Sequence, residues 1–247
     1  MNRLCASLAV AITTVLTGVQ VAAGPPYVTD DPQPTEHGHY EIYVFTAGTT
    51  TFDGTGGQAG FDLNYGGAEN LQLTMVLPTA FDHPHGGPDV AGFGDIELAA
   101  KYKFLHQEDF GIDVAVFPRL FLPTSSAPGL GSSHAALFVP FFAQKDWGDW
   151  SVFGGGGCTI NRGGSSQDFC KAGLVVTRRI LPALQVGLEA YHQTPDEKGA
   201  RHATGIGAGA VYDLSEHYHL MAFAGSGVQN RDAANQASWY AALLFTY

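Results

Sequence analysis

The stretch that decides the fold is Gly92-Phe93-Gly94-Asp95-Ile96-Glu97-Leu98-Ala99-Ala100-Lys101-Tyr102-Lys103-Phe104-Leu105, whose side chains separate into two sets at a period of two. The charged side chains occupy odd positions, and the apolar ones occupy even positions from Ile96 to Phe104. A β-strand places alternate side chains on opposite faces, whereas no helix divides this sequence in that way. The stretch therefore predicts a strand that lies between a polar and an apolar medium.

The N-terminus indicates export. Arg3 and the α-amino group precede an apolar run over residues 4–21, and Val21-Ala22-Ala23 offers small residues for cleavage. We therefore predict a secretory signal peptide over 1–23, export through the Sec pathway and a mature chain that begins at Gly24. A single membrane anchor is the alternative, but polar interruptions in the run favour the signal peptide.

Composition excludes several classes of protein. The formal net charge is −11, and loss of residues 1–23 removes one base and no acid, which argues against nucleic acid as a partner. Glycine is abundant, at 32 residues, and no run after residue 24 has helical apolar spacing or the length of a membrane-spanning helix. The exported chain is therefore predicted to be all-β.

From residue 39 onward the chain reads as strands separated by turn residues, as in a transmembrane barrel. We predict a closed antiparallel β-barrel of about 12 strands over 39–247 in the outer membrane. The expected strands are 39–50, 58–66, 68–81, 92–105, 110–123, 133–145, 149–162, 168–181, 183–194, 202–214, 217–229 and a last one that ends at 247.

Connection lengths alternate between short and long, as they do between the periplasmic and external sides of such barrels. The short ones are 66–67, 106–109, 146–148, 181–182 and 215–216, and the longer ones are 51–57, 81–91, 124–132, 195–201 and 230–234.

The C-terminus carries a further signal. One apolar face, formed by Trp239, Ala241, Leu243, Phe245 and Tyr247, ends in an aromatic residue and is similar to the closing strand that the outer-membrane assembly machinery recognises. Aromatic girdles at the lipid interfaces would then include Tyr40, Tyr102, Trp150, Trp239 and Tyr247.

Prolines constrain the layout. Residues 24–38 carry Pro25, Pro26, Pro32 and Pro34, so they form either an extended lead-in or a plug inside the barrel. Prolines at 78, 118 and 140 cannot donate to a sheet ladder, so we expect them near strand ends or at bulges.

The polar faces of the strands define a candidate lumen. In the hairpin of 92–105 and 110–123, one register pairs Asp95 with Arg119 and Lys101 with Asp113. Such pairs could set the register alone or also select solutes, and net charge does not predict cation preference because several bases point inward. The expected lumen-lining residues are Glu41, Asn70, Gln72, Asp95, Glu97, Lys101, Lys103, Asp113, Arg119, Lys171, Arg179, Glu189 and Tyr191.

Cys158 and Cys170 flank a glycine-serine turn in a compartment that would be oxidising after export. Their positions in an antiparallel hairpin predict a cross-strand disulfide on the outward face, with a pair of buried thiols as the alternative.

Two motifs carry a resemblance: Pro25-Pro26-Tyr27-Val28-Thr29-Asp30-Asp31-Pro32 with Gly38-His39-Tyr40-Glu41-Ile42-Tyr43, and Gly92-Phe93-Gly94-Asp95-Ile96-Glu97 with Lys101-Tyr102. Over most of the mature chain, the sequence resembles the bacterial outer-membrane family named for the meta-pathway of phenol degradation. The resemblance implies a monomeric barrel that passes small solutes, including aromatic or hydrophobic ones, and it supplies no catalytic residues.

Enzymatic and metal chemistry find little support. Asp82-His83-Pro84-His85, or His37 with His39, lacks the further ligand that a metal site needs, so neither a metal nor a cofactor is expected. An outer-membrane lipid hydrolase would need Ser132 or Ser133 beside His134 and a third orienting group, which the sequence does not reveal. The prediction is a non-enzymatic channel or transporter with lipid, a small solute and the assembly machinery as partners; an occluded structural barrel is the further alternative.

Overall fold

The computed structural model describes residues 26–127, 129–162 and 166–247, so the predicted signal peptide over 1–23 and Gly24 lie outside the described residues. Fourteen strand segments form one sheet. They are β1 (Tyr40–Thr51), β2 (Gly54–Ala68), β3 (Leu71–Pro84), β4 (Val90–Phe93), β5 (Ile96–Leu105), β6 (Asp113–Val116), β7 (Arg119–Leu122), β8 (Ala136–Trp147), β9 (Trp150–Ile160), β10 (Phe169–Leu181), β11 (Leu184–Gln193), β12 (Ala203–Asp213), β13 (Tyr218–Gln229) and β14 (Ala237–Thr246).

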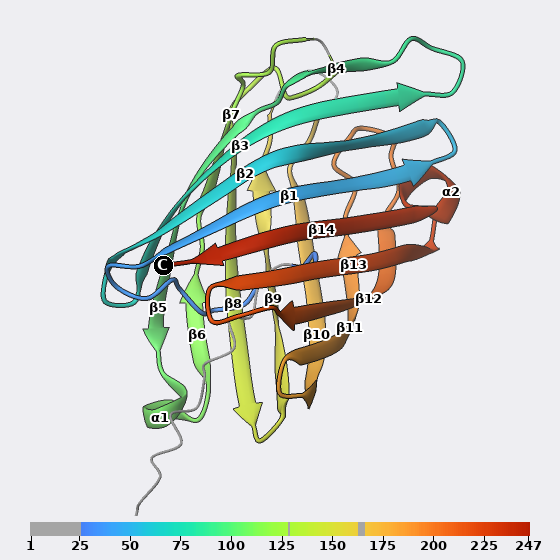
Figure 1. Cartoon of the computed structure of the whole chain (residues 1–247). Helices are drawn as coiled ribbons and strands as arrows, with labels where there is room; N and C mark the ends of the chain where they lie inside the picture. The colour runs from blue at the N-terminus through green and yellow to red at the C-terminus, as the bar shows by residue number, and fades with distance from the viewer. Residues whose placement is uncertain (1–25, 128, 163–165) are drawn as a thin grey trace, which may run out of the picture.

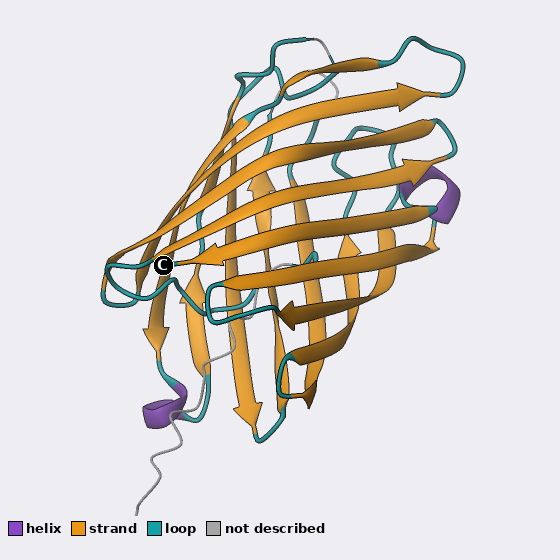
Figure 2. Ribbon diagram, viewed as in Figure 1, coloured by secondary structure: helices purple, strands orange, loops and turns teal. Residues whose placement is uncertain are grey.

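The sheet closes on itself into an antiparallel barrel (Figures 1 and 2). β4 and β5 both pair with β3, and β6 and β7 both pair with β5 and β8, so each couple is one interrupted strand and the barrel has 12 strands. Closure comes from β1 and β14, in a register that sets Glu41 opposite Thr246. The predicted closed barrel of 12 strands is therefore confirmed.

The two ends of the barrel differ. The end where β1 starts and β14 finishes, which we name the turn end, has the connections 69–70, 106–112, 148–149, 182–183 and 214–217. The opposite end, the loop end, has the connections 52–53, 85–89, 123–135, 161–168, 194–202 and 230–236. The expected long loop over 51–57 is wrong, because pairing continues to Thr51 and Gly54 and leaves a two-residue turn.

Each of the two helices in the described residues is a single turn: α1 (Gln107–Phe110) at the turn end and α2 (Arg231–Ala234) at the loop end. Neither has the length or hydropathy to cross a membrane.

The interruptions lie where prolines withhold an amide donor. Pro78 accepts a hydrogen bond from Gly94 N (2.9 Å) but returns none, and β4 and β5 separate at that point. Pro118 lies between β6 and β7, opposite Ala100, and Pro140 accepts from Phe117 N (3.1 Å) at the same interruption. Two residues that form a hydrogen-bonded antiparallel pair normally exchange two backbone hydrogen bonds. A proline has no amide N–H and makes only one of the two, so the neighbouring strand is interrupted opposite it. Pro118 therefore lies at a strand end as expected, whereas prolines 78 and 140 lie within β3 and β8, opposite breaks in their neighbours.

Side chains alternate between the lumen and the outer surface. Inward positions such as Gln72, Lys101 and Gln144 are buried, while outward positions such as Leu98 and Leu188 are exposed. The expected girdle residues Tyr40, Tyr102, Trp150 and Tyr247 are exposed near the turn end, whereas Trp239 lies near the loop end, opposite Gly48. An apolar exterior around a polar interior is the pattern of a transmembrane barrel.

The predicted register of β5 against β6 and β7 is wrong. Arg119 lies opposite Ala99, not Asp95, which is a shift of four positions that keeps every side chain on its expected face. The cause is a longer turn than the expected 106–109. Helix α1 occupies it, Gly111 ends the helix at φ 76°, and Gln107 N donates to Asp113 (2.8 Å). Cross-strand charge pairs are worth only about 0.2 to 1 kcal/mol each, too little to override that turn.

The predicted disulfide between Cys158 and Cys170 is confirmed. The two residues are direct cross-strand partners in β9 and β10. They alternate with the inward residues Thr159 and Lys171, so the bridge lies on the outward face near the loop end.

Candidate functional site

The lumen holds the segment that precedes β1. Residues 26–38 run inside the barrel, and Asp31 and Thr35 are almost completely buried. Gly38 N donates to Gly66 O (2.8 Å), which ties the end of this segment to β2. Of the two alternatives drawn from the prolines, these contacts correspond to the plug, and we name residues 26–38 the plug.

Inward side chains of β3, β5, β6 and β11 hold the plug. Glu189 accepts from the backbone amides of Val28 (3.0 Å) and Thr29 (2.7 Å), and Gln72 accepts from Thr35 N (2.8 Å). Gln33 bridges two strands, since it donates to Asp113 (2.9 Å) and accepts from Lys103 (2.8 Å). The plug therefore uses lumen residues from widely separated strands.

Ion pairs at the middle of the lumen join the plug to the wall. Lys101 Nζ lies 2.9 Å from an oxygen of Asp30 and 3.8 Å from one of Asp31. Arg119 Nε donates to Glu97 (2.6 Å), and its Nη1 lies 3.9 Å from Asp30. We name these five residues the ionic septum.

The two plug carboxyls of the septum differ electrostatically. Burial opposes ionisation of Asp30, but Lys101 and Arg119 outweigh it and lower the pKa of Asp30 below 3.8. Burial raises the pKa of Asp31 to about 7, because the attraction of Lys101 does not compensate for lost solvation and Asp30 adds repulsion.

Aromatic packing and small residues make room for the start of the plug. The ring of Tyr27 meets Phe153 and Phe223 edge-on, with centroids 5.9 and 6.0 Å apart. A Cβ atom on Gly187 or Gly209 would collide with Tyr27, and one on Gly173 would collide with Thr29. These glycines on β10, β11 and β12 thus form the floor on which the plug rests.

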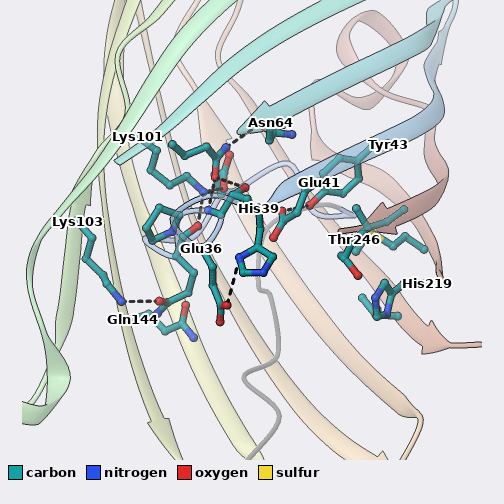
Figure 3. A pocket seen from close by; sticks show the side chains of 18 of the residues that line it. Glu36, His39, Glu41, Tyr43, Asn64, Lys101, Lys103, Gln144, His219 and Thr246 are labelled. Atoms are coloured by element: carbon teal, nitrogen blue, oxygen red, sulfur yellow. Dashed lines mark hydrogen bonds and ion pairs between the residues drawn. The ribbon is translucent and has the colours of Figure 1, made fainter. Parts of the chain in front are cut away.

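Two cavities lie along the lumen, on either side of the septum. The turn-end cavity has a volume of about 1060 Å³ and is lined by the septum residues Asp30, Lys101 and Arg119 (Figure 3). The loop-end cavity has about 350 Å³ and is lined by Glu97 and Asp95. The lumen is therefore a path that the plug and septum divide into two compartments.

Most expected lumen residues lie on inward positions, although the pairs assigned to them differ. Asn70 lies in the β2–β3 turn at φ 63° and lines the turn-end cavity. Lys171 lies over the ring of Phe138, 5.5 Å from its centroid, and Tyr191 accepts a hydrogen bond from Asn235 (2.6 Å). The others line a cavity or hold the plug: Glu41, Gln72, Asp95, Glu97, Lys101, Lys103, Asp113, Arg119, Arg179 and Glu189.

Asp95 serves a different purpose from the predicted ion pair. Its carboxylate accepts hydrogen bonds from the backbone amides of Thr124 (3.1 Å), Ser125 (3.1 Å) and Ser132 (2.6 Å). It thereby fastens the loop over 123–135 across the loop end of the lumen.

Sequence reasoning missed the partners of the plug and the apolar part of the lumen. Tyr43, Val211, Met221 and Leu244 pack as a buried cluster on inward positions of β1 and β12 to β14. The alternation of polar and apolar residues did not show which side chains of the glycine-rich strands face the lumen. The paired acids Asp30 and Asp31, between prolines, were the signal that could have indicated basic partners in the lumen.

Histidines that were considered as metal ligands contact nearby acids or backbone oxygens instead. His83 Nδ1 lies 3.0 Å from Asp89, His85 contacts Phe52 O, and His39 lies 3.8 Å from Glu36. Within the described ranges, no three His, Cys, Asp or Glu side chains gather as a metal site would require.

The hydroxyl of Ser133 lies 2.7 Å from His134 Nδ1 on an exposed loop. Among the described residues, no third group contacts His134 to orient it, so this couple lacks the geometry of a hydrolase triad.

A closed twelve-stranded barrel with an apolar exterior and a plugged polar lumen defines an outer-membrane β-barrel fold. The chain belongs to the family described as "Putative MetA-pathway of phenol degradation", whose model matches residues 20–241. No match was found among curated protein sequences.

Solved structures share the fold. The COG4313 outer membrane channel from Pseudomonas putida F1 superposes with a TM-score of 0.73 at 16% identity, covering 88% of this chain and 98% of that one. The beta domain of the Bordetella autotransporter BrkA gives a TM-score of 0.55 at 15% identity, covering 86% and 100%. Outer membrane phospholipase A from Escherichia coli gives only 0.43 at 12% identity, covering 89% and 92%.

Proposed function

We propose that the protein is a non-enzymatic outer-membrane channel for small solutes, aromatic or hydrophobic ones among them, whose charged lumen is closed by the plug. The observation that carries this proposal is the pair of cavities in the lumen, between which the plug and the ionic septum lie. A barrel built as a rigid structural element has no need of a cavity of about 1060 Å³ lined with ionisable groups.

The barrel would have a defined orientation in the outer membrane and would reach it by export and assisted insertion. The turn end would face the periplasm, because short connections lie on that side of outer-membrane barrels. The chain would be exported through the Sec pathway, inserted by the assembly machinery through β14, and would act as a monomer surrounded by lipid. The family and the channel with which it shares its fold support the assignment.

Liposome swelling with a panel of uncharged and aromatic solutes tests the channel directly. Removal of residues 24–38 from the exported chain should raise conductance and solute uptake, because the septum loses its plug carboxylates. If intact and truncated barrels are both impermeable to ions and small aromatics, the protein is an occluded structural barrel and the proposal fails.

The lipid-hydrolase alternative has a separate test. His134→Ala should leave lipid turnover in purified membranes unchanged, because the Ser133–His134 couple lacks an orienting group in the described chain. If the unmodified barrel hydrolyses lipid and this variant does not, the protein is a lipid hydrolase and the channel proposal is wrong.

A further inference from the structure

We infer that the turn-end cavity binds small organic cations that carry an apolar body, with the ammonium group held by the β8–β9 wall. The inference rests on the proposed channel and names the class of solute that would occupy it. It follows from the charge balance of the cavity, from two unpartnered acceptors and from the wall that faces them.

The bases of the cavity wall are already neutralised by acids. Lys101 pairs with Asp30, Lys103 lies 3.8 Å from Asp113, and Arg179 lies 3.4 Å from Asp213. Arg119 pairs with Glu97. Each lysine and arginine that lines the cavity in the described chain therefore has an acidic partner, which weakens its attraction for an anionic solute.

The acids of the β8–β9 wall lack such cationic partners among the described residues. Asp146 accepts hydrogen bonds from the side-chain amide of Gln144, at 2.9 and 3.0 Å, and this donor is neutral. Asp149 follows in the next turn, and both acids are exposed at the mouth of the cavity. Glu41, Asp62, Glu69 and Glu216 also line the cavity without an ion pair in the described chain, so the cavity as a whole carries surplus negative charge. Asp146 and Asp149 place part of that charge on the β8–β9 wall.

Two acceptors next to these acids are buried without a partner. Ser151 is 7% exposed and Gln144 is 3% exposed, and both line the cavity. Ser151 Oγ and Gln144 Oε1 have no hydrogen-bond partner among the described atoms. Unsatisfied buried acceptors are uncommon and indicate a place where a donor binds, and an ammonium group supplies up to three donors.

The opposite wall carries an apolar patch beside the polar side chains of Glu41, His219 and Thr246. Leu244 and Met221 are 1% and 4% exposed, and they line the same cavity from β14 and β13, beside Tyr43 of β1. The strand order sets β8 and β9 half-way around the barrel from β14 and β1. Gln144 accordingly lies across the cavity from Tyr43 and Thr246 in Figure 3. A solute that satisfies both walls has a cationic head and an apolar body.

Three probes of one shape and different charge test the inference: benzylammonium, benzyl alcohol and benzoate. Calorimetric titration of the purified full exported barrel should give benzylammonium an affinity about ten-fold higher than benzyl alcohol, with benzoate the weakest. Asp146→Asn and Ser151→Ala should each reduce the preference for the ammonium over the alcohol several-fold. Leu244→Ala should weaken both equally.

Glu108→Gln is the matched control, because Glu108 is an exposed acid of α1 outside the cavity lining. Equal affinity for the three probes, or a preference for benzoate, overturns the inference. An unchanged preference for benzylammonium in both wall variants also overturns the inference. Each variant must first be shown to fold, by the difference in gel mobility between unheated and boiled samples. Glycerol uptake by liposomes that contain the same barrel reports separately on the channel. Glycerol uptake without a preference for the ammonium probe therefore rejects only the inference. Binding of the ammonium without uptake of any probe or glycerol rejects only the channel.

Discussion

Arg119 donates a hydrogen bond of 2.6 Å to Glu97, and the two residues line different cavities of the same lumen. This contact lies on the wall side of the septum, and Lys101 and Arg119 connect the wall to Asp30 of the plug. The barrier between the two compartments is thus an ion-pair network, to which the strands contribute Glu97, Lys101 and Arg119 and the plug contributes Asp30 and Asp31.

Arg119→Met should raise single-channel conductance several-fold, because it removes the bond to Glu97 and the attraction to Asp30. Planar-bilayer recording measures this directly. Arg178→Met is the control, since Arg178 lies on the outward face over Trp150, 5.0 Å from the ring centroid. Equal conductance of the two variants would contradict a septum at this position.

Lys101→Met should release the plug. It leaves Asp30 buried with only a distant guanidinium, and loss of one partner of a buried pair costs about 3 to 5 kcal/mol. Hydrogen exchange of residues 26–38 should accelerate while the strands stay protected. Gly209→Leu should do the same without changing charge, because it displaces Tyr27. If only the charge variant accelerates exchange, the plug is held by the septum alone.

Plug docking should weaken as the pH rises from 4 to above 7. The pKa of Asp31 is raised from 3.8 to about 7 in the docked state, so its contribution is present at low pH and is lost as the pH rises through 7. The lowered pKa of Asp30 acts oppositely, and its contribution disappears only in acid below 3.8. Conductance recorded between pH 5 and 8 should therefore increase with pH.

Asp31→Asn should abolish the increase between pH 5 and 8, since an amide cannot ionise. Lys101, Asp30 and Glu41 also face this carboxyl, and their retention in the variant isolates the effect of Asp31. An unchanged pH profile in this variant would assign the titration to another group.

Asp95→Ala should free the loop over 123–135. Three backbone amides lose a charged acceptor, and hydrogen bonds to charged groups contribute about 1.5 to 3 kcal/mol each. Limited proteolysis of whole cells should then cut this loop faster than in the unmodified barrel. Asp89→Asn, on the exposed 85–89 loop, should have no such effect; equal cleavage in both variants would reject the role of Asp95.

Loss of the disulfide should lower stability without altering transport. The bridge closes a loop with a sequence separation of 12, for which chain entropy predicts about 3 kcal/mol. The double variant Cys158→Ala with Cys170→Ala should unfold at a lower denaturant concentration while solute uptake stays unchanged, because the bridge faces outward. A change in uptake at unchanged stability would show that the bridge acts on the lumen.

Local patterns in the sequence determined the strands and their faces. The alternation from Asp95 to Phe104 depends only on neighbouring residues, since a strand reverses its side chains at every step. The same holds for the pairing of Cys158 with Cys170, because a single short hairpin connects them. The strand count and the disulfide could therefore be read before any coordinates.

Only the tertiary structure decided the register of Arg119, the seat of the plug and the division of the lumen. The register depended on the turn before Asp113, where helix α1 adds residues that the charge pairs used to assign the register did not reveal. The contact of Thr29 with Glu189 spans 160 residues, and no periodicity reports which acid meets which amide over that distance. Closure of the barrel brings such residues together, so the site exists only in the folded chain.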